Sequence, residues 1–499
     1  MAAQLPVTVS AAKASVAPKV FKRPGSKIAK ASVAAPIVAV NPMKFKINKE
    51  DEHKMEFTLS PIHVSYANTL RRLILTGIET VAFRSDMTLT GTTTDVLVAQ
   101  NDTPMTNEML ADRIGLVPIH VKEPLTWNKD KYVFTLNISG KEDRTTYVTA
   151  SDFKIKEVKD DQSFEVVPEQ NEETDEQKHE VDEVKDKKQG GADKNEYERE
   201  IASNELFIPN ALTQQTSLIA ILQPSNPPQK LNIIAKASIG TGREHARFSP
   251  VSQCSYEYSL DSNEERIDQM FTTWLSVAKK IDNIDKTSEK YNIVWREFNT
   301  MQIKRCYLMN EKQQPYSYDF TIETIGTLPI KYIVSRACDV GENLCNRYVN
   351  IDTIINDKDI TVSPASSRII GFDFLIRGQD HTLGNLLQTW LVDNHIEGTS
   401  VPKITYAGYC VPHPLRDEII LRIGVEDGKE ETARKALATA ARGCALMFRQ
   451  MRESWLKETS GVPRSAAPTL RAAASSFVPK AAPTAPTAAT APITVKKLE

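Results

Sequence analysis

The sequence predicts an α+β fold of two related units, with a mostly β segment inserted into the first. Three observations support this prediction. Residues 370–376 (Ile-Gly-Phe-Asp-Phe-Leu-Ile) alternate between apolar and other residues as a strand does, and a helix pattern begins near Asp380. A second strand-like run followed by a helix pattern occurs near residue 65. Between these two regions, residues 91–250 contain several short strand-like runs.

The helix after Asp380 has a single apolar stripe at spacing i, i+3, i+4, i+7 and i+8, formed by Leu383, Leu386, Leu387, Trp390 and Leu391. Burying one such side chain contributes about 1.5–3 kcal/mol, so the stripe requires a partner surface. The helix near residue 65 has a comparable stripe formed by Tyr66, Leu70, Leu73 and Ile74. We therefore predict that the two stripes pack together as a dimerisation core.

A short internal repeat supports this pairing. Residues 65–70 and 382–387 share the pattern hydroxyl, large apolar, small, Asn, any residue, Leu. A six-position match can arise by chance, but both copies follow a strand-like run and both open a helix. We expect the two copies to be halves of one pseudo-symmetric arrangement, since two-fold pairing is the commonest mode of association.

Five motifs, in order, resemble the α-like subunits of multisubunit DNA-directed RNA polymerases. Residues 65–73, 105–118 and 242–250 are similar to motifs of the third-largest subunit, called D in archaea. Residues 380–385 and 406–415 resemble its small partner, called L. The chain looks like the two subunits fused, as in large cytoplasmic DNA viruses. The resemblance implies a non-catalytic assembly platform for the largest and second-largest polymerase subunits.

The resemblance also implies which residues dock those partners. They are Asn68, Arg71 and Arg72 on the first motif helix, and Arg243, His245 and Arg247 on a turn. A guanidinium suits docking because its planar head carries several donors. The alternative for the helix pair is an exposed, merely solvated arginine. Small α-associated polymerase subunits are expected as further partners, and DNA or RNA only indirectly.

Composition separates the remaining segments. Residues 1–42 carry six basic and no acidic residues and five prolines, which favours a disordered basic tail over a transit peptide. Residues 151–200 carry eighteen acidic and nine basic residues, which predicts a disordered or loosely helical acidic insertion. Residues 458–499 are rich in Ala, Pro and Thr and are expected to form a disordered tail.

The expected domains follow from these boundaries. They are 43–90 with 316–356 for the first α-like dimerisation domain, 91–250 for the inserted domain, 251–315 for a helical insertion or linker, and 366–457 for the L-type domain, with 357–367 as a short linker. Family layout implies a helix near 340–350. We expect Gly77 to end the first motif helix in a left-handed conformation. A long helix is expected from about Glu430, with one buried face formed by Ala433, Leu437, Ala440, Cys444, Phe448, Met451 and Trp455.

No catalytic residue is predicted. Asp380-His381 allows an acid–base interpretation, but adjacent side chains at a helix start diverge and no third group is identifiable to orient the imidazole. Asp380 is expected to act as a helix N-cap. An enzyme using this pair and a stand-alone interaction scaffold remain the rival hypotheses.

No metal or cofactor is predicted either. Many members of the resembled family hold zinc or an iron–sulfur cluster through cysteines in the inserted domain. This chain has no cysteine before Cys254, which excludes thiolate ligation there, and His120 and His179 cannot complete a four-ligand site.

The sequence further predicts an intracellular location. Six scattered cysteines fit reduced thiols, and no run of eighteen apolar residues predicts a membrane span. The viral resemblance implies a viral factory in the host cytoplasm and the virion; otherwise the nucleus is expected.

Overall fold

The structure, a computed structural model, describes residues 43–85, 95–158, 197–210, 213–281, 284–354, 358–366 and 368–461. The predicted N-terminal tail, most of the predicted C-terminal tail and most of the predicted acidic insertion lie outside these residues. The start of the C-terminal tail was predicted wrongly, because residues 458–461 belong to the final helix. The described chain divides into two compact units. One contains residues 348–443, and the other contains residues 43–347 and 444–461.

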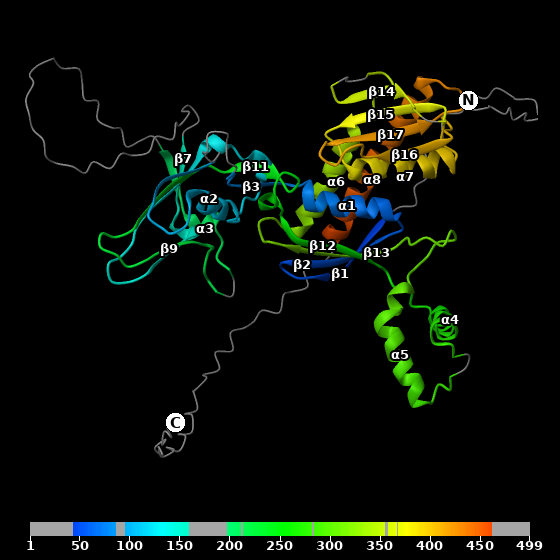
Figure 1. The fold of residues 1–499 in the computed structure, drawn as a ribbon, viewed down its shortest axis with the longest axis horizontal. Helices are drawn as coiled ribbons and strands as arrows, with labels where there is room; N and C mark the ends of the chain where they lie inside the picture. Colours follow the sequence, from blue (N-terminus) through cyan, green and yellow to red (C-terminus); the bar gives the residue numbers. More distant parts are fainter. Residues whose placement is uncertain are drawn as a thin grey trace, which may run out of the picture. The chain divides into compact units, whose positions relative to one another are not determined.

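The first half of the chain builds an antiparallel sheet of order β1-β2-β13-β12 (Figure 1). Its strands are β1 (Lys44–Glu50), β2 (Lys54–Ser60), β12 (Val251–Tyr258) and β13 (Tyr318–Thr324). Helices α1 (Val64–Thr76) and α6 (Ile330–Asn346) pack on each other, and they contact β12 and β13 respectively. The alternation predicted for β2 places Met55, Phe57 and Leu59 in the core, because successive strand residues face opposite sides of a sheet.

The second half builds a sheet of order β14-β15-β17-β16. Its elements are β14 (Ile360–Pro364), β15 (Gly371–Arg377), α7 (His381–Leu391) with a π-helical turn (Val392–Ile396), β16 (Tyr406–Cys410), β17 (Glu418–Gly424) and α8 (Glu430–Gly461). Both sheets therefore have one topology: two strands, a helix, two strands and a helix, with the fourth strand lying between the second and third. The predicted α+β class with two related units is confirmed.

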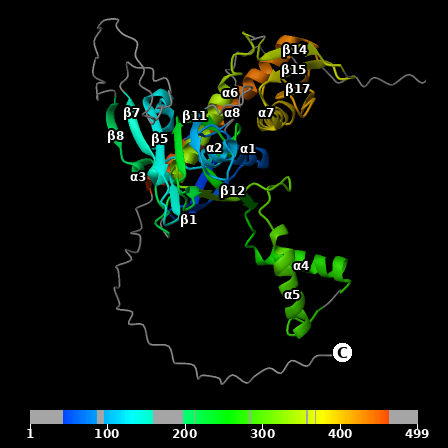
Figure 2. The same ribbon diagram turned by 60° about the vertical axis from the view of Figure 1, so that its left-hand side comes forward.

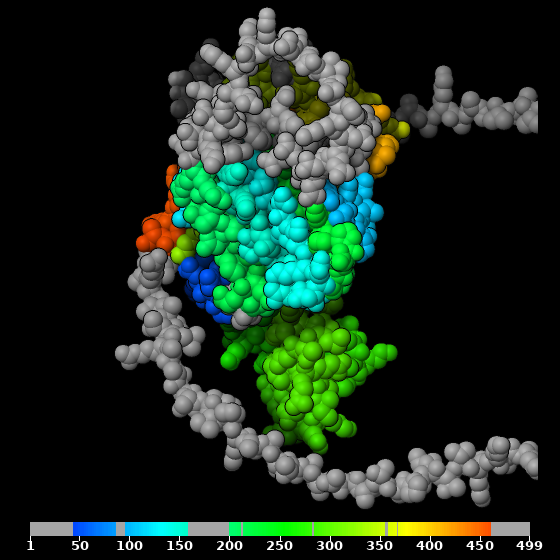
Figure 3. Space-filling model, turned by 90° about the vertical axis from the view of Figure 1, so that its left-hand side faces the viewer, coloured from blue at the N-terminus to red at the C-terminus, as the bar shows by residue number. Residues whose placement is uncertain are grey.

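The inserted segment is mostly β, as predicted. Its elements are β3 (Glu79–Ala82), β4 (Val96–Asn101), α2 (Asn107–Gly115), β5 (Tyr132–Ser139), β6 (Thr146–Thr149), β7 (Lys154–Val158), β8 (Tyr197–Ile201), α3 (Ser203–Leu206), β9 (Leu218–Leu222), β10 (Lys230–Ala235) and β11 (Ser238–Thr241). Five of the strands form the sheet β4-β10-β5-β7-β8, while β6 pairs with β9 and β3 with β11. Residues from both ends of the segment consequently share one surface, where cyan and green atoms interleave in Figure 3. Phe83, Phe134, Phe153 and Phe207 pack together in its core.

A helical hairpin joins β12 to β13. It consists of α4 (Glu264–Trp274), a π-helical turn (Leu275–Lys279) and α5 (Glu289–Met301). Phe271, Leu275, Phe298 and Cys306 form its own small core. The prediction of helices between 255 and 315 is correct for this part of the segment. Residues 255–258 differ, because they belong to β12 and pair with β13.

Three further predictions differ from the structure. The expected linker 357–367 contains β14, which pairs with β15 and buries Ile360. The helix expected near 340–350 spans Ile330–Asn346, because its buried residues begin at Ile330. Helix α1 ends at Gly77 as predicted, but with φ −103°, which is not left-handed. A glycine still suits that position, since a Cβ would lie 3.0 Å from the Leu73 carbonyl oxygen.

The final helix contributes to the core of the first sheet. All seven residues predicted for its apolar face are buried. The Trp455 ring centroid lies 5.2 Å from that of Phe45 and 5.1 Å from that of Phe57, and its Nε1–H donates to the Lys331 carbonyl at 3.0 Å. Figures 1 and 2 show this part of α8 running beside α6. The first half is therefore completed by residues from the far end of the chain.

In the part of the chain that the structure describes, none of the helices combines the length and apolar character needed to cross a bilayer.

Candidate functional site

The two predicted apolar stripes are buried. Tyr66, Leu70, Leu73 and Ile74 of α1 and Leu383, Leu386, Leu387, Trp390 and Leu391 of α7 are each at most 8% exposed. Within its own unit, α1 lies against α6 and β12, and α7 lies against β16 and β17.

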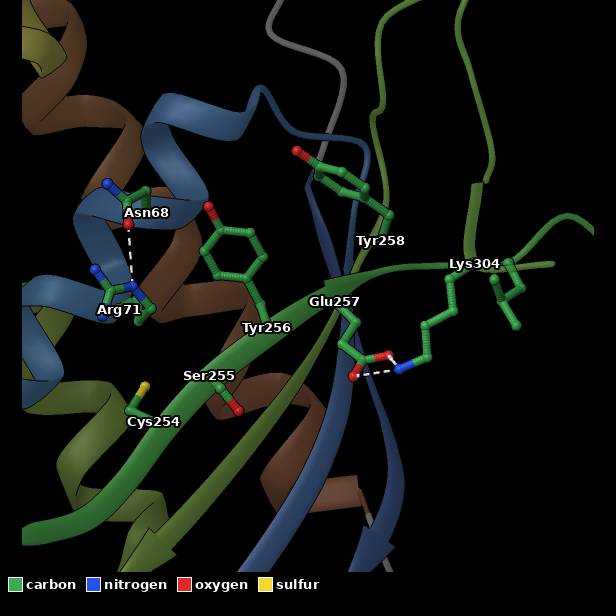
Figure 4. Close-up of a pocket in the computed structure, with 9 residues that line it drawn as sticks. Asn68, Arg71, Cys254, Ser255, Tyr256, Glu257, Tyr258 and Lys304 are labelled. Carbon is green, nitrogen blue, oxygen red and sulfur yellow. Dashed lines mark hydrogen bonds and ion pairs between the residues drawn. The ribbon is translucent and has the colours of Figure 1, made fainter. Parts of the chain in front are cut away.

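The polar residues of the α1 motif line a pocket beside β12. Arg71 is half-buried, and its Nε–H donates to Asn68 Oδ1 at 3.0 Å. Arg72 is also half-buried. Figure 4 shows Tyr256 pointing from β12 toward Asn68 and Arg71. The pocket measures about 580 Å³ and is lined by Asn68, Arg71, Cys254, Ser255, Tyr256, Glu257, Tyr258, Leu260 and Lys304.

The chemistry of this pocket suits recognition. Burial raises the pKa of the Cys254 thiol to about 12, against the opposing effect of the Arg71 charge, so the thiol stays protonated near neutral pH. Burial also raises the pKa of the Tyr256 phenol. At the other end of the pocket, Lys304 Nζ lies 3.0 Å from a Glu257 carboxylate oxygen. The pocket therefore offers cations, hydroxyl groups and aromatic surface, with no ionised nucleophile at Cys254.

The turn at 242–250 is seated on the C-terminal end of α1. A Cβ on Gly242 would lie 2.3 Å from the Leu75 carbonyl oxygen, so only glycine allows this approach. The Arg243 backbone N–H donates to the Thr76 carbonyl at 3.1 Å. Arg243 and His245 are exposed, as expected for a turn that projects side chains.

Arg247 does not project, contrary to our expectation. Its side chain is 4% exposed. Nη1 donates to the Phe83 carbonyl at 3.0 Å and to Ser85 Oγ at 2.5 Å, while Nη2 lies 4.0 Å from Asp112 Oδ1. Gly115 makes room for it, since a Cβ there would lie 2.8 Å from Nη1. The buried Arg247 side chain thus connects the 242–250 motif to Asp112 and Gly115 of the 105–118 motif.

The two motifs of the second half also meet. Asp380 caps α7, because its Oδ1 accepts the Thr382 N–H at 2.8 Å. Gly384 lies against the Tyr409 ring, where a Cβ would approach within 2.4 Å of a ring carbon. The His381 Nδ1 atom is 3.2 Å from the Tyr409 hydroxyl. The imidazole therefore contacts a phenol, which gives the acid–base hypothesis no support.

The two histidines considered as metal ligands differ in their status. His120 Nδ1 lies 3.1 Å from the Leu206 carbonyl oxygen, and burial lowers the pKa of the ring. His179 falls outside the described residues. Within the described ranges, no three His, Cys, Asp or Glu side chains are grouped to hold a metal ion.

Sequence reasoning missed the β12 side of the pocket. Tyr256, Tyr258 and Lys304 belong to a region for which only helices were expected. The spacing of the two tyrosines at i and i+2 was the available strand signal. It was weak because the buried residues of β12, Val251 and Cys254, are three positions apart across a bulge.

A pair of sheet-and-helix units of one topology, with motifs gathered at the end of α1, defines an α+β protein built around two related domains. Two family models, both described as RNA polymerase Rpb3/Rpb11 dimerisation domain, match residues 56–345 and 372–454. The first match alone covers more than half of the chain. The chain belongs to the RNA polymerase Rpb3/Rpb11 dimerisation-domain family.

Similar proteins agree with this assignment. The chain is 22% identical over 328 residues to DNA-directed RNA polymerase subunit Rpo3 of Methanosphaera stadtmanae, covering 64% of this chain and 100% of the relative. It is 24% identical over 326 residues to subunit RPAC1 of DNA-directed RNA polymerases I and III from Homo sapiens, covering 60% and 82%. For the corresponding Dictyostelium discoideum subunit the values are 24% over 328 residues, covering 61% and 83%. The predicted resemblance to α-like polymerase subunits is confirmed.

Proposed function

We propose that this chain is a non-catalytic assembly subunit of a DNA-dependent RNA polymerase, in which two α-like units joined on one chain dock the two large catalytic subunits. The observation that carries the proposal is the meeting of three motifs: Gly242 and Arg243 lie on the end of α1, and Arg247 reaches the 105–118 motif. Two dimerisation-domain matches on one chain support the fusion. Relatives that are named as polymerase subunits support the assignment to transcription.

The proposed mechanism is geometric. The stripes of α1 and α7 occupy equivalent positions in two units of one topology, and we propose that these helices pair about a pseudo-two-fold axis. Joining the units on one chain makes that association intramolecular, at an effective concentration of about millimolar for a suitable connection. The paired units then present Asn68, Arg71, Arg72, Arg243 and His245 to the large subunits, while Arg247 supports the turn from within.

The test is to recover what the full-length chain binds. A tagged chain, purified from the cells that produce it, should bring down the largest and second-largest polymerase subunits together with small α-associated subunits. Mass spectrometry identifies them. Purification of the intact chain without either large subunit would overturn the proposal and leave a stand-alone interaction scaffold.

Charge-removal variants test the docking residues. The double variant Arg71→Ala, Arg72→Ala should recover the large subunits at least about tenfold less well, since truncating docking arginines at an interface centre costs about 2 kcal/mol or more. The control is Arg296→Ala, Arg305→Ala, which removes two exposed guanidinium groups from the hairpin segment. Equal recovery by both double variants would contradict the assigned docking residues.

We further propose that the chain holds no zinc or iron–sulfur cluster. We also propose a location: the cytoplasmic factory and the virion for a viral protein, and the nucleus for a cellular one. The first part rests on the absence of cysteine before Cys254. Metal analysis of the purified chain checks it, and one equivalent of tightly bound zinc or iron would contradict it. Imaging of the tagged chain during infection or growth checks the location.

A further inference from the structure

The edge strands of the two four-stranded sheets differ in whether a side chain covers their outward backbone groups. An edge strand presents backbone N–H and C=O groups that can pair with another chain unless they are covered. On β1, the Ile47 N–H donates to the Glu458 carboxylate at 3.3 Å, and the register slips between Ile47 and Lys49. On β16, the Tyr409 N–H donates to Gln388 Oε1 at 3.2 Å. Both edges are therefore capped by a side chain of their own unit.

The strand β12 is the counterpart of β16 in the first half. Tyr256 pairs with Phe320, and Tyr409 pairs with Leu421. These two pairs are at equivalent register. Leu59 lies five residues before α1 and pairs with Tyr318, two residues before Phe320. Ile376 lies five residues before α7 and pairs with Ile419, two residues before Leu421. Tyr256 therefore occupies the position of Tyr409, and its N–H faces the same way, outward from the sheet.

The cap on β16 has no equivalent on β12. Aligning the two helices places Arg71 at the position of Gln388. An arginine side chain has donors and no acceptor, so Arg71 cannot cap the Tyr256 N–H as Gln388 caps that of Tyr409. Among the residues that the structure describes, the backbone of 255–258 forms no hydrogen bond outside its ladder with β13. This edge is open.

The pocket beside the open edge supplies side-chain recognition. The half-buried Arg71 guanidinium has a neutral amide, Asn68, as its hydrogen-bond partner, so its charge is not neutralised by that contact. Tyr258 and Leu260 are 39% and 48% exposed and offer apolar surface at the other end. A carboxylate is the group that complements Arg71, because charge-assisted hydrogen bonds to guanidinium are the strong ones.

We propose that β12 is a strand-addition site: an extended segment of a partner polymerase subunit pairs with its outer edge and places an acidic side chain against Arg71. Main-chain hydrogen bonds then supply affinity, and the pocket supplies specificity. The partner's identity as a polymerase subunit rests on the function proposed above. The open edge of β12 and the charge of Arg71 are features of the structure and do not depend on that function.

A matched pair of variants tests the backbone contribution. Tyr256→Pro and Tyr256→Ala both remove the ring, but only proline removes the outward N–H, and proline is tolerated at a strand edge whose N–H faces outward. We expect Tyr256→Pro to recover the partner subunits at least about tenfold less well than Tyr256→Ala. With proline, the added strand loses a hydrogen bond, and the proline ring keeps that strand from approaching β12 closely. Equal recovery by the two variants would overturn strand addition. Large-subunit recovery by the wild-type chain in that same assay would show that the assembly function nevertheless holds.

Two further measurements keep the test independent of how the variants fold. Amide hydrogen exchange of residues 251–258 should slow at least about tenfold when the wild-type chain enters the polymerase, since addition converts open amides to ladder amides. Unchanged exchange would overturn the proposal. A photo-crosslinker at the exposed position 257 should capture another polymerase subunit. Capture of residues 159–196 of this chain, or of a second copy of it, would overturn the assigned occupant.

Discussion

The two halves of this protein share one topology but differ in how their elements are connected. In the second half, residues 392–405 connect α7 to β16, and residues 411–417 connect β16 to β17. In the first half, the inserted domain separates α1 from β12, and the α4–α5 hairpin separates β12 from β13. The sheet order is unaffected. The difference shows that long insertions are compatible with this fold where they leave and re-enter at strand and helix ends, because the cost of closing a longer loop grows slowly with length.

The two halves also differ at equivalent helix positions. Gln388 in the second half accepts a backbone N–H from the edge of its own sheet, whereas Arg71 in the first half donates to Asn68 and has no acceptor to offer an edge N–H. Gln388 caps the edge strand β16, whereas its counterpart Arg71 leaves the edge of β12 uncapped. The second half is thus the internal control for the first, and each prediction below tests one contrast between them.

The largest expected effect comes from charging the helix stripes. Leu387→Asp and Leu70→Asp each place a carboxylate at a side chain that is 0% exposed, which costs several kcal/mol because the charge has no partner there. We expect loss of soluble protein and of the large partners in both cases. Leu415→Asp, at a side chain 89% exposed, is the control and should be near neutral. Wild-type solubility and assembly of Leu387→Asp would contradict the buried-stripe interpretation.

The next effect separates the two cores. Trp455→Ala removes a ring that packs on Phe45 and Phe57 and should lower the free energy of unfolding of the unit containing the first sheet by about 3–5 kcal/mol. Hydrogen exchange should accelerate in β1 and β2 and remain unchanged in β15. Leu456→Ala, at a side chain 49% exposed, is the matched control. Equal acceleration in both sheets would show that α8 does not distinguish the halves.

A smaller effect concerns acid. His395, in the second half, is fully buried; its Nδ1 donates to the Pro402 carbonyl at 2.7 Å, and Nε2 has no hydrogen-bond partner. Burial lowers its pKa from 6.5, so the folded state binds fewer protons than the unfolded state. The resulting stability is therefore present above the unfolded pKa and declines as pH falls through it.

The measurement for His395 is thermal unfolding of the second half between about pH 7.5 and pH 5. His395→Asn keeps an N–H donor for Pro402 and cannot be protonated in this range, so the loss of stability with falling pH should be shallower than in wild type. His53→Asn, at an exposed position, is the control. A slope identical to wild type in His395→Asn would contradict this account.

The smallest effect compares the helix caps. Asp380 accepts the Thr382 N–H at 2.8 Å, whereas His63 Nδ1 accepts the Ser65 N–H at 3.2 Å. Asp380→Ala should cost about 1 kcal/mol of stability, and Asp380→Asn, which keeps an acceptor, much less. His63→Ala should cost less than Asp380→Ala because its bond is longer and its acceptor neutral. Denaturant unfolding of the three variants checks this order.

Much of the fold could be predicted from local patterns. The stripes of α1 and α7, the alternation of β2 and β15, and the apolar face of α8 are all repeated within one element, so a window of residues reveals them. Of the residues predicted to dock partners, Asn68 and Arg71 line the pocket and Arg243 and His245 are exposed, and their docking role stays a prediction. Tyr256 and Lys304 were missed, because they line a pocket with residues of α1, which lies far away in the sequence.

The sequence by itself determined the fold class, the two related units and the family, because apolar periodicity and motif order are properties of the chain. Only the tertiary structure decided that Arg247 faces inward, that residues 360–364 complete a sheet, that Trp455 enters the first core and that β12 keeps an open edge. Those outcomes depend on distant segments meeting, where backbone hydrogen bonds must be matched and side chains must fit a space that no single segment encodes.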